Sequence, residues 1–574
     1  MHRLRFDPQL ALFIGLAAIL AGCGGTGGSG PGSHQNFALA ATPVIIVQGL
    51  TQSSTITITP QNGFSGSVAL SASNLPAGVT GVFNPSSATT TSTLTLTATA
   101  TATLGATTVT ISGVSGTLMN TTNFNLSVIK LGQIDHVVII FQENRTTDNL
   151  FQDPVLIGRG ADIQNYGYTS DGTKITLTPV SLETTYDLGH SHDAFLQACQ
   201  WTGTACAMNG SDLVPCAGTG CPQYASLQYV EASDVQPYYT IAETYAFGDR
   251  MFQTNEGPSF PAHQYILSGT SAISAASTTY VSDNPNNNAR ADGTPGAGCL
   301  APPAASVNTL DTSQPFPNHT YGTINGQECF DHPTLPDVLA NYGLSWKYYA
   351  AQDGYIWTAP DAIQQICTPT SGPPDQLTCN GTEWNDNVVI EGSGTQITTD
   401  INNGLLANVT WVIPAGQNSD HAGGNQGGGP SWVASIVNAI GQSPFWADTA
   451  IIVTWDDWGG WYDHVAPPIR NSEPYFNSYE YGFRVPLIVV SPYAKQAYIS
   501  HQVNDFGSIL KFIEEIFVLP PIDQSVGYAD SYTPGDLQDS FDFNQFNGFT
   551  QIDAPLKTDY FRNDKSPPLP PDDD

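Results

Sequence analysis

The stretch AIIVTWDDWGGWYDH, residues 450–464, decides the fold of this chain. Ile451 to Thr454 form a short apolar run that leads into two adjacent carboxylates, Asp456 and Asp457. Such a run predicts a buried strand of a parallel sheet, and open α/β sheets bind their ligands beyond the carboxyl ends of the strands. Because two buried carboxylates repel each other, the stretch predicts a bound cation. The alternative is a strand end whose acids are solvated.

The composition excludes one class of partner. The chain has 574 residues, with 50 Asp and Glu against 16 Lys and Arg, and a formal net charge of -34. A nucleic-acid-binding protein needs the opposite balance, so no nucleic-acid partner is expected. Only 11% of the residues are charged, which argues against an acidic disordered chain. The length allows several domains.

The N-terminus predicts export. Arg3 and Arg5 precede an apolar run, residues 10–20, that is too short for a comfortable membrane span. The run ends in LAGC, which resembles a bacterial lipoprotein signal, so residues 1–23 are predicted to be the signal peptide and Cys23 the lipid anchor in a bacterial membrane or cell surface. An ordinary signal peptide with an incidental Cys is the alternative. Residues 24–35 read as a flexible linker.

The remaining eight cysteines predict disulfides. An even number of cysteines in an exported chain suggests up to four bridges. Eight cysteines allow 105 pairings, and Cys216 and Cys221 are expected to pair because of their short spacing. The natural neighbours in sequence are Cys199/Cys206, Cys216/Cys221, Cys299/Cys329 and Cys367/Cys379.

Residues 36–130 predict a small all-β sandwich of the Ig-like type. No Asp, Glu, Lys or Arg occurs from Pro8 to Ile129, and short runs rich in Val, Ile and Thr alternate with turn signals such as Gln61-Asn62-Gly63. This spacing suits about seven strands. The predicted role is a spacer, with adhesion as the alternative.

Residues 131–562 predict one large α/β domain with a central, mostly parallel sheet flanked by helices. Strand-like and helix-like runs alternate over this range. Residues 563–574 are predicted to be a disordered tail. The expected strands are 135–141, 345–350, 409–414 and 484–490, and the expected helices include 430–440 and 503–517.

Two further segments carry chemistry. Glu143 and Asn144 follow the first strand of the α/β domain, so a carboxylate and an amide repeat the pattern of the opening stretch, as a metal site at a sheet edge requires. In GPSFPAH, Ser259 stands between two prolines, which presents its hydroxyl as a nucleophile or ligand. Alternatively, Ser259 lies in a rigid surface turn and Asn144 is a turn residue. His263 is compatible with a helix cap.

Taken together, QENRTTDNLF, GPSFPAH and WDDWGGWYDHVAPP resemble the signature segments of the bacterial phosphoesterase family. This family contains phospholipases C and acid phosphatases of the alkaline-phosphatase-like fold. The resemblance covers about residues 134–562. It implies a metal-dependent phosphoesterase that hydrolyses phosphate esters through a phosphorylated serine.

The resemblance also implies roles for individual residues. Ser259 would be the nucleophile, and His421 and His190 would serve the ester and the phosphate. Asn144 would bind the metal or a phosphate oxygen, and His192 is an alternative to His190. One divalent ion (Mg, Ca, Mn or Zn) would be held by Glu143, Asn144, Ser259, Asp456 and Asp457. His332 and His464 are equally compatible with structural and catalytic roles.

The substrate is inferred less directly. A diester needs little positive charge around its second ester oxygen, and the motif segments carry only Arg145 beside the site. This favours phospholipase C-type cleavage of a phospholipid over an acid phosphatase activity on monoesters. An aromatic box for a choline-like cation is one prediction for the aromatic residues of the motif, and core packing is the alternative: Trp455, Trp458, Trp461 and Tyr462. A non-catalytic adhesion lipoprotein is the alternative from another class.

Overall fold

The computed structural model describes residues 35–130, 134–290, 293–314, 319–326, 328–372, 376–390, 395–470, 481–523 and 525–571. The predicted signal peptide, Cys23 and all but the last residue of the predicted linker lie outside this part of the chain. The chain divides into two compact units, Met1–Leu131 with Asp523–Ser525, and Gly132–Ile522 with Val526–Asp574. Within the described residues, no helix combines the length and the apolar character that crossing a bilayer demands.

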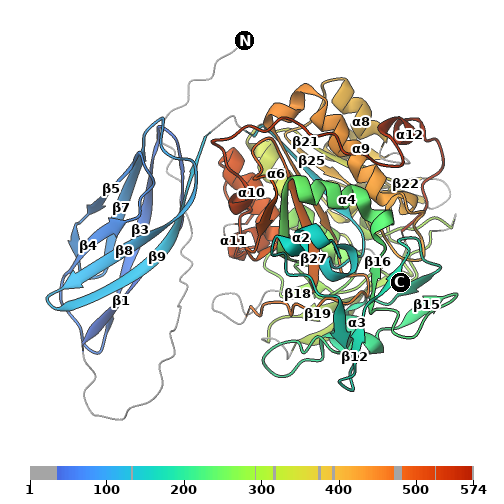
Figure 1. Cartoon of the computed structure of the whole chain (residues 1–574), viewed down its shortest axis with the longest axis horizontal. Coiled ribbons are helices and arrows are strands. Elements are labelled where there is room, and N and C mark those ends of the chain that lie inside the picture. The colour runs from blue at the N-terminus through green and yellow to red at the C-terminus, as the bar shows by residue number, and fades with distance from the viewer. Residues whose placement is uncertain are drawn as a thin grey trace. The chain divides into compact units, whose positions relative to one another are not determined.

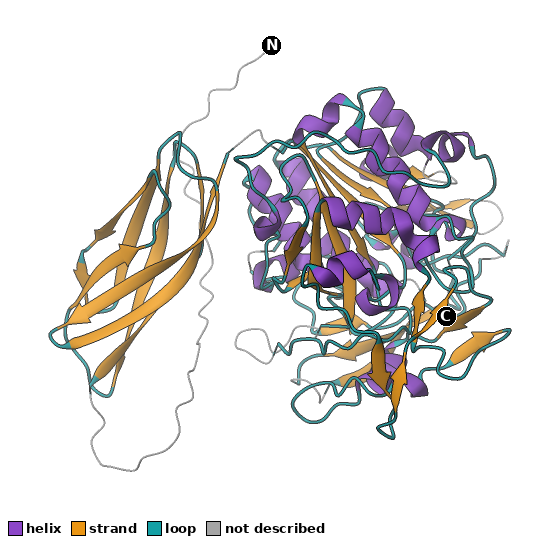
Figure 2. Cartoon of the chain, in the orientation of Figure 1, coloured by secondary structure: helices purple, strands orange, loops and turns teal. Residues whose placement is uncertain are grey.

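The first unit is all β. Its alternating Thr and Ile residues put one side chain in the core and the next in solvent, as β3 shows at Ile56 and Ile58. Two sheets enclose this core (Figure 2), and they contain more strands than the expected seven or so. One sheet has the order β1 (Asn36–Ala41), β3 (Thr51–Gln61), β7 (Thr91–Ala98), β5 (Val79–Asn84), and the other β2 (Val44–Val47), β9 (Leu118–Ile129), β8 (Gly105–Ser115), β4 (Val68–Ser73), β6 (Ser87–Ala88).

The second unit is a mixed α/β domain around one large sheet. All the strand pairs from β24 to β26 are parallel, while β27 runs antiparallel to both of its neighbours, so the sheet is mostly parallel as expected. Its order is β24 (Val388–Ile390), β21 (Trp346–Ala350), β25 (Val409–Val412), β10 (His136–Gln142), β26 (Thr449–Trp455), β27 (Arg484–Val490), β17 (Ala246–Phe252), β28 (Tyr498–Ser500), with β29 (Asn504–Asp505) also on β17.

Helices flank this sheet in two groups (Figure 1). One group is α4 (Ala232–Thr244), α8 (Thr395–Asn402), α9 (Gly429–Gly441) and α12 (Thr558–Asn563), and the other is α5 (Ser259–Ser268), α6 (Leu335–Asn341), α10 (Phe506–Phe517) and α11 (Ala529–Tyr532). The remaining helices are α1 (Thr147–Leu150), α2 (Pro154–Gly158), α3 (His192–Cys199) and α7 (Thr382–Asn387).

Small sheets extend the domain beyond its central sheet. They are β11 (Tyr166–Tyr168) with β12 (Lys174–Thr176), β13 (Thr178–Val180) with β16 (Gln228–Val230), β14 (Tyr186–Leu188) with β15 (Cys216–Gly218), β18 (Thr279–Val281) with β19 (Ser306–Asp311) and β20 (Thr320–Asn325), and β22 (Thr368–Gly372) with β23 (Gln376–Asn380).

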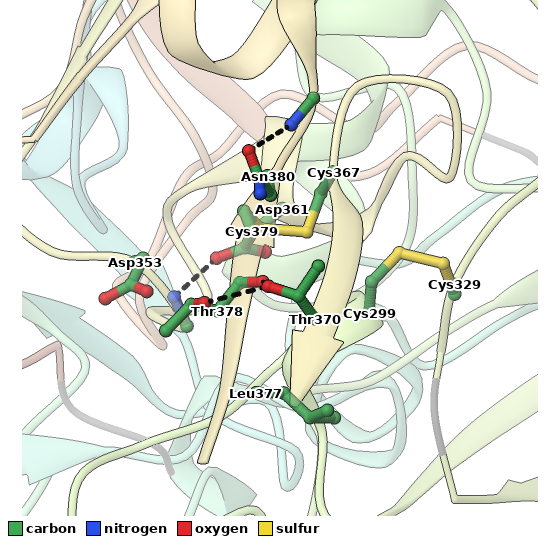
Figure 3. Close-up of a disulfide and its surroundings, with 12 residues drawn as sticks. Cys299, Cys329, Asp353, Asp361, Cys367, Thr370, Leu377, Thr378, Cys379 and Asn380 are labelled. Atoms are coloured by element: carbon green, nitrogen blue, oxygen red, sulfur yellow. Dashed lines mark hydrogen bonds between the residues drawn. A yellow bond between two sulfur atoms is a disulfide. The ribbon is translucent and has the colours of Figure 1, made fainter. Parts of the chain in front are cut away.

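Four disulfides fasten the connections of this domain. All four join the natural neighbours, including the expected Cys216–Cys221 pair. Figure 3 shows Cys367–Cys379 between β22 and β23, with Cys299–Cys329 in the same region. Each bridge therefore closes a segment outside the central sheet.

The C-terminal segment differs from the expected disordered tail. The backbone N–H of Leu569 donates to Oε1 of Gln417, and the carbonyl oxygen of Leu569 accepts from the N–H of Gly416. Pro571 is buried. The described part of the tail is therefore held against the domain, because its backbone finds partners in the loop after β25 that composition alone does not reveal.

Candidate active site

The candidate site lies where two adjacent parallel strands end. In the register of β10 with β26, Gln142 pairs with Trp455. The residues that follow, Glu143 on one strand and Asp456 on the other, must therefore leave the sheet side by side. The parallel register thus brings together the two acidic segments that the sequence separates by more than 300 residues.

Backbone N–H groups hold one oxygen of Asp456 in place. Its Oδ1 accepts hydrogen bonds from the N–H of Asn144 at 2.8 Å and of Asp457 at 2.7 Å. Asn144 has a φ of 60°, in the left-handed region. Gly459 allows this approach, because a Cβ there would lie 2.3 Å from the carbonyl oxygen of Asn144. The strand-end loops are therefore fixed to each other through main-chain contacts.

Ser259 is the first residue of α5, so its hydroxyl lies at a helix N-terminus. The side chain is buried, with 1% exposed, and the hydroxyl donates to Oδ2 of Asp457 at 3.2 Å. The other oxygen of Asp457 accepts from the N–H of Gly459. A helix N-terminus stabilises negative charge, so the position suits a nucleophile that takes up a phosphoryl group.

His263 is a site residue that the sequence reading missed. Its Nε2 lies 3.3 Å from Oε1 of Glu143 and 3.7 Å from Oδ2 of Asp456, whereas the sequence offers only a helix cap for this residue. The spacing from Ser259 is i to i+4, which places both side chains on one face of α5. That spacing, read together with the proposed nucleophile, was the available signal. Glu143, His263 and Asp456 each offer a ligand atom within 4.8 Å of the others.

The electrostatics of this cluster favour a bound cation. Burial, followed by the charge of Asp456, raises the pKa of Glu143 and of Asp457 well above the ordinary carboxyl value. Burial also lowers the pKa of His263 to about 4, which leaves a neutral imidazole. Among the described residues, no Lys or Arg forms an ion pair with these three carboxylates. Buried acids without a counter-charge are costly.

Several polar atoms of these residues are buried and have no partner. Both carboxylate oxygens of Glu143, Oδ1 of Asn144, Oδ2 of Asp456 and Nε2 of His263 are buried and have no hydrogen-bond partner among the described residues. These are the donor atoms that a divalent ion would use. The residues present therefore fit a metal ion, and the donor set contains a nitrogen as well as oxygens.

Of the two candidate histidines in DLGHSHDAF, His190 reaches the cluster. The side-chain N–H of Asn144 donates to Nε2 of His190 at 3.0 Å, and Nδ1 of His190 donates to the carbonyl oxygen of Leu188. The ring of His421 packs against that of His190 at 5.5 Å between centroids, nearly perpendicular. His190 thus contacts Asn144 directly, and His421 lies beside His190.

Three other histidines lie outside the cluster. His192 contacts the carbonyl oxygen of Glu256 and the hydroxyl of Tyr321. His332 stacks on Phe330 and bonds to the carbonyl oxygen of its neighbour Pro333. His464 contacts two carboxylates away from the cluster and is treated separately below.

Arg145 and the aromatic residues of the motif belong to the core. The guanidinium of Arg145 donates to the carbonyl oxygens of Asp420 and Leu182 and to Oδ1 of Asn149, and it lies over the ring of Trp461. The four aromatic side chains are almost fully buried. Trp455 packs on Tyr238, and the other three lie in three distinct apolar clusters: Trp458, Trp461 and Tyr462. The four side chains therefore do not form one box.

The family follows from comparison with known sequences. The model of the Phosphoesterase family matches residues 134–520, more than half of the chain and all of the site just described. The chain belongs to the phosphoesterase family. The motifs of the sequence predicted this family.

Curated relatives of this phosphoesterase are phospholipases C. The hemolytic phospholipase C of Pseudomonas aeruginosa is 25% identical and is matched over 80% of this chain and 63% of its own. The non-hemolytic phospholipase C of Burkholderia pseudomallei is 23% identical, and the match covers 72% of this chain and 60% of the relative. Phospholipase C A of Mycobacterium tuberculosis is 24% identical, and the match covers 72% of this chain and 78% of the relative. The chain thus spans less than two thirds of the first two.

Among solved structures, domains 4 and 5 of the S-layer protein SbsC match 16% of this chain and 51% of their own, at 22% identity and a TM-score of 0.14. At that TM-score the likeness carries no argument about the fold.

Proposed function

We propose that this phosphoesterase cleaves phosphodiesters in the manner of a phospholipase C, with Ser259 as nucleophile and one divalent ion as cofactor. The domain would have the alkaline-phosphatase-like fold. The observation that carries the proposal is the convergence of buried ligand atoms from Glu143, Asp456 and His263. The unpartnered Oδ1 of Asn144 follows Glu143 directly, and Ser259 stands at a helix N-terminus in contact with Asp457. Structural clusters of buried acids normally carry their own counter-charges.

The chain's own residues would divide the work as follows. The Oγ of Ser259 attacks phosphorus while its proton passes to Oδ2 of Asp457, the atom it already contacts, and the bond from phosphorus to the leaving oxygen breaks. His421 supplies the proton that the leaving oxygen requires. Nε2 of His190 accepts a hydrogen bond from the side-chain N–H of Asn144. This bond fixes the orientation of the amide and so directs its Oδ1 away from His190. Water then hydrolyses the phosphoserine ester.

A bound divalent ion would polarise the phosphate and make the serine hydroxyl more acidic. Glu143, Asn144, Asp456 and His263 would hold it, and the family resemblance adds Asp457 and Ser259, which contact each other. Mg, Ca, Mn and Zn remain the candidates. The nitrogen of His263 favours Zn or Mn over the oxygen-preferring Ca and Mg.

The preference for a diester rests on charge. A monoester dianion needs additional cations, yet the guanidinium of Arg145 is committed to protein oxygens. Phosphatidylcholine and a bis-aryl phosphodiester should therefore be hydrolysed better than an aryl phosphate monoester. A monoester preference of about a hundredfold in kcat/KM, some 2.7 kcal/mol, would assign an acid phosphatase instead. Complete inactivity toward all three substrates, with and without added metal, would favour the adhesion lipoprotein.

The cellular setting is part of the same proposal. Four disulfides are typical of an exported protein, and Cys23 would anchor the chain to a bacterial membrane near phospholipid. The all-β unit would act as an Ig-like spacer. Metabolic labelling with a radioactive fatty acid, with Cys23→Ala as control, tests the anchor.

A further inference from the structure

A second cluster of buried charges lies next to the candidate site and has no place in the proposed chemistry. We name it the Arg484 network, and it consists of Asp148, Asp162, Asp463, His464 and Arg484. Asp148, Asp463 and His464 also meet the distance requirement for holding a metal ion. Asp148, Asp463 and His464 occur in the same signature segments as the site residues, QENRTTDNLF and WYDH.

Arg484 forms the centre of this network. It is fully buried on β27, and its side chain pairs with Asp148 at 3.1 Å and with Asp463 at 3.0 Å. Its remaining N–H groups donate to the carbonyl oxygens of Asp162 and Asp249. The guanidinium therefore already fills the space between these carboxylates and supplies the positive charge that a metal ion would otherwise provide.

His464 completes the network at its edge. Its Nδ1 lies 2.6 Å from Oδ2 of Asp148, and its Nε2 lies 3.0 Å from Oδ1 of Asp162. Its backbone N–H also donates to Asp148. Since both ring nitrogens face carboxylate oxygens, the ring is suited to be an imidazolium that donates twice.

The charges of the network then balance. Three carboxylates, on Asp148, Asp162 and Asp463, face Arg484, an imidazolium at His464, and Arg250, which pairs with Asp162. Farther out, Asp249 pairs with His501. Burial lowers the pKa of His464, but the hydrogen bond and charge of Asp148 outweigh it, so that the pKa of His464 is raised. The network needs no metal, in contrast to the cluster of Glu143, His263 and Asp456.

The network joins the two loops that carry the candidate ligands. Asp148 follows Asn144 by four residues, and Asp463 and His464 follow Asp457 by six and seven. We propose that His464 is a positioning residue that bridges Asp148 and Asp162 and thereby locks the loop after β26 onto the loop after β10. This inference rests on the proposed metal site for its effect on function.

The test replaces His464 by Gln, which keeps a side chain of similar reach but loses the charge and one of the two bridges. Residues that orient metal ligands change metal affinity by about 10- to 100-fold when they are lost. In His464→Gln we expect Zn²⁺ and Mn²⁺ affinity, measured by chelator competition, to fall by about tenfold or more, and kcat to fall while KM is unchanged. His501→Gln is the matched control, since its side chain is 60% exposed and pairs with Asp249 at the outer edge.

Hydrogen exchange gives a readout that needs no metal. The amides of Asn144 and Asp457 donate to Asp456, and both should exchange at least about tenfold faster in His464→Gln, with the peptide of α9 unchanged. If the wild-type protein binds neither Zn²⁺ nor Mn²⁺, the proposed cofactor is wrong. The exchange measurement would still decide whether His464 is a positioning residue.

The positioning role is overturned by unchanged exchange in both loops, or by an increase that is equal in α9 and so reports only general destabilisation. If His464→Gln does not fold, Asp162→Asn is the second variant, and the side chain of Asp162 is 40% exposed. It loses the ionic outer bridge and the ion pair with Arg250 but keeps the contact of His464 with Asp148. Asp162→Asn should produce the same local increase in amide exchange. If exchange does not increase, the positioning role of His464 is overturned.

Discussion

The hydroxyl of Ser259 donates to Oδ2 of Asp457 at 3.2 Å, across 198 residues of sequence. One partner begins α5 and the other follows β26, so the contact joins a helix N-terminus to the carboxyl end of a central strand. Such a contact aligns the hydroxyl and receives its proton, which an activated nucleophile needs.

Replacement of Ser259 by Ala should abolish turnover and leave the fold intact. We expect kcat to fall by about a thousandfold or more, as for other lost nucleophiles, with an unchanged melting temperature within a few degrees. Ser268→Ala, at the other end of α5, is the control and should retain activity. Near-normal turnover in Ser259→Ala would show that another group attacks phosphorus.

Replacement of His263 by Gln should weaken metal binding. The variant loses the nitrogen that lies 3.3 Å from Glu143, so we expect at least about tenfold lower Zn²⁺ affinity and a smaller loss for Mg²⁺. Metal content by mass spectrometry and competition with a chelator measure both. His332→Gln, a buried histidine outside the cluster, should bind metal like the wild type. Equal affinities in all three proteins would remove His263 from the ligand set.

Stability should fall as the pH rises above about 4.5. Burial raises the pKa of Glu328 and of Glu515 to about 8. A carboxyl group whose pKa is raised by folding stabilises the native state below its unfolded pKa, and this contribution is lost as the pH rises through the folded pKa. The carboxylate oxygens of Glu328 have no hydrogen-bond partner among the described residues.

Glu328→Gln isolates this effect. Between pH 5 and pH 8 the melting temperature of the variant should fall less than that of the wild type, because the glutamine side chain does not ionise. The exposed Glu231 provides the control variant Glu231→Gln, which should follow the wild-type curve. Parallel curves for wild type and Glu328→Gln would mean that Glu328 is ionised throughout.

Removal of Cys299–Cys329 should destabilise the domain more than removal of Cys216–Cys221. The sequence separations are 30 and 5. The chain-entropy model then gives a difference of about 1.6 kcal/mol. Double Cys→Ser variants compared by denaturant unfolding measure it, and thiol titration of the unfolded, mature wild type should find almost no free thiols. A larger loss for Cys216–Cys221 would contradict the loop-length argument.

Much of the site was predictable because parallel strands end at one edge. Glu143 and Asp456 follow apolar runs, and strands of that kind must lie in one sheet with their carboxyl ends together. The four disulfides likewise join neighbouring cysteines of the sequence. In three of them a loop of 5, 7 or 12 residues keeps the two cysteines close, whereas Cys299 and Cys329 are 30 residues apart.

The sequence by itself determined the mixed α/β domain, the all-β unit before it and the family, because periodicity and local motifs are properties of adjacent residues. Only the tertiary structure decided which histidines act together. His263 reaches Glu143 because α5 docks against the end of β10, and His190 rather than His192 faces Asn144. The aromatic residues of the motif were likewise placed by packing, since apolar side chains that could line a pocket gain more by filling the core. Long-range docking of this kind leaves no periodic signal in the chain.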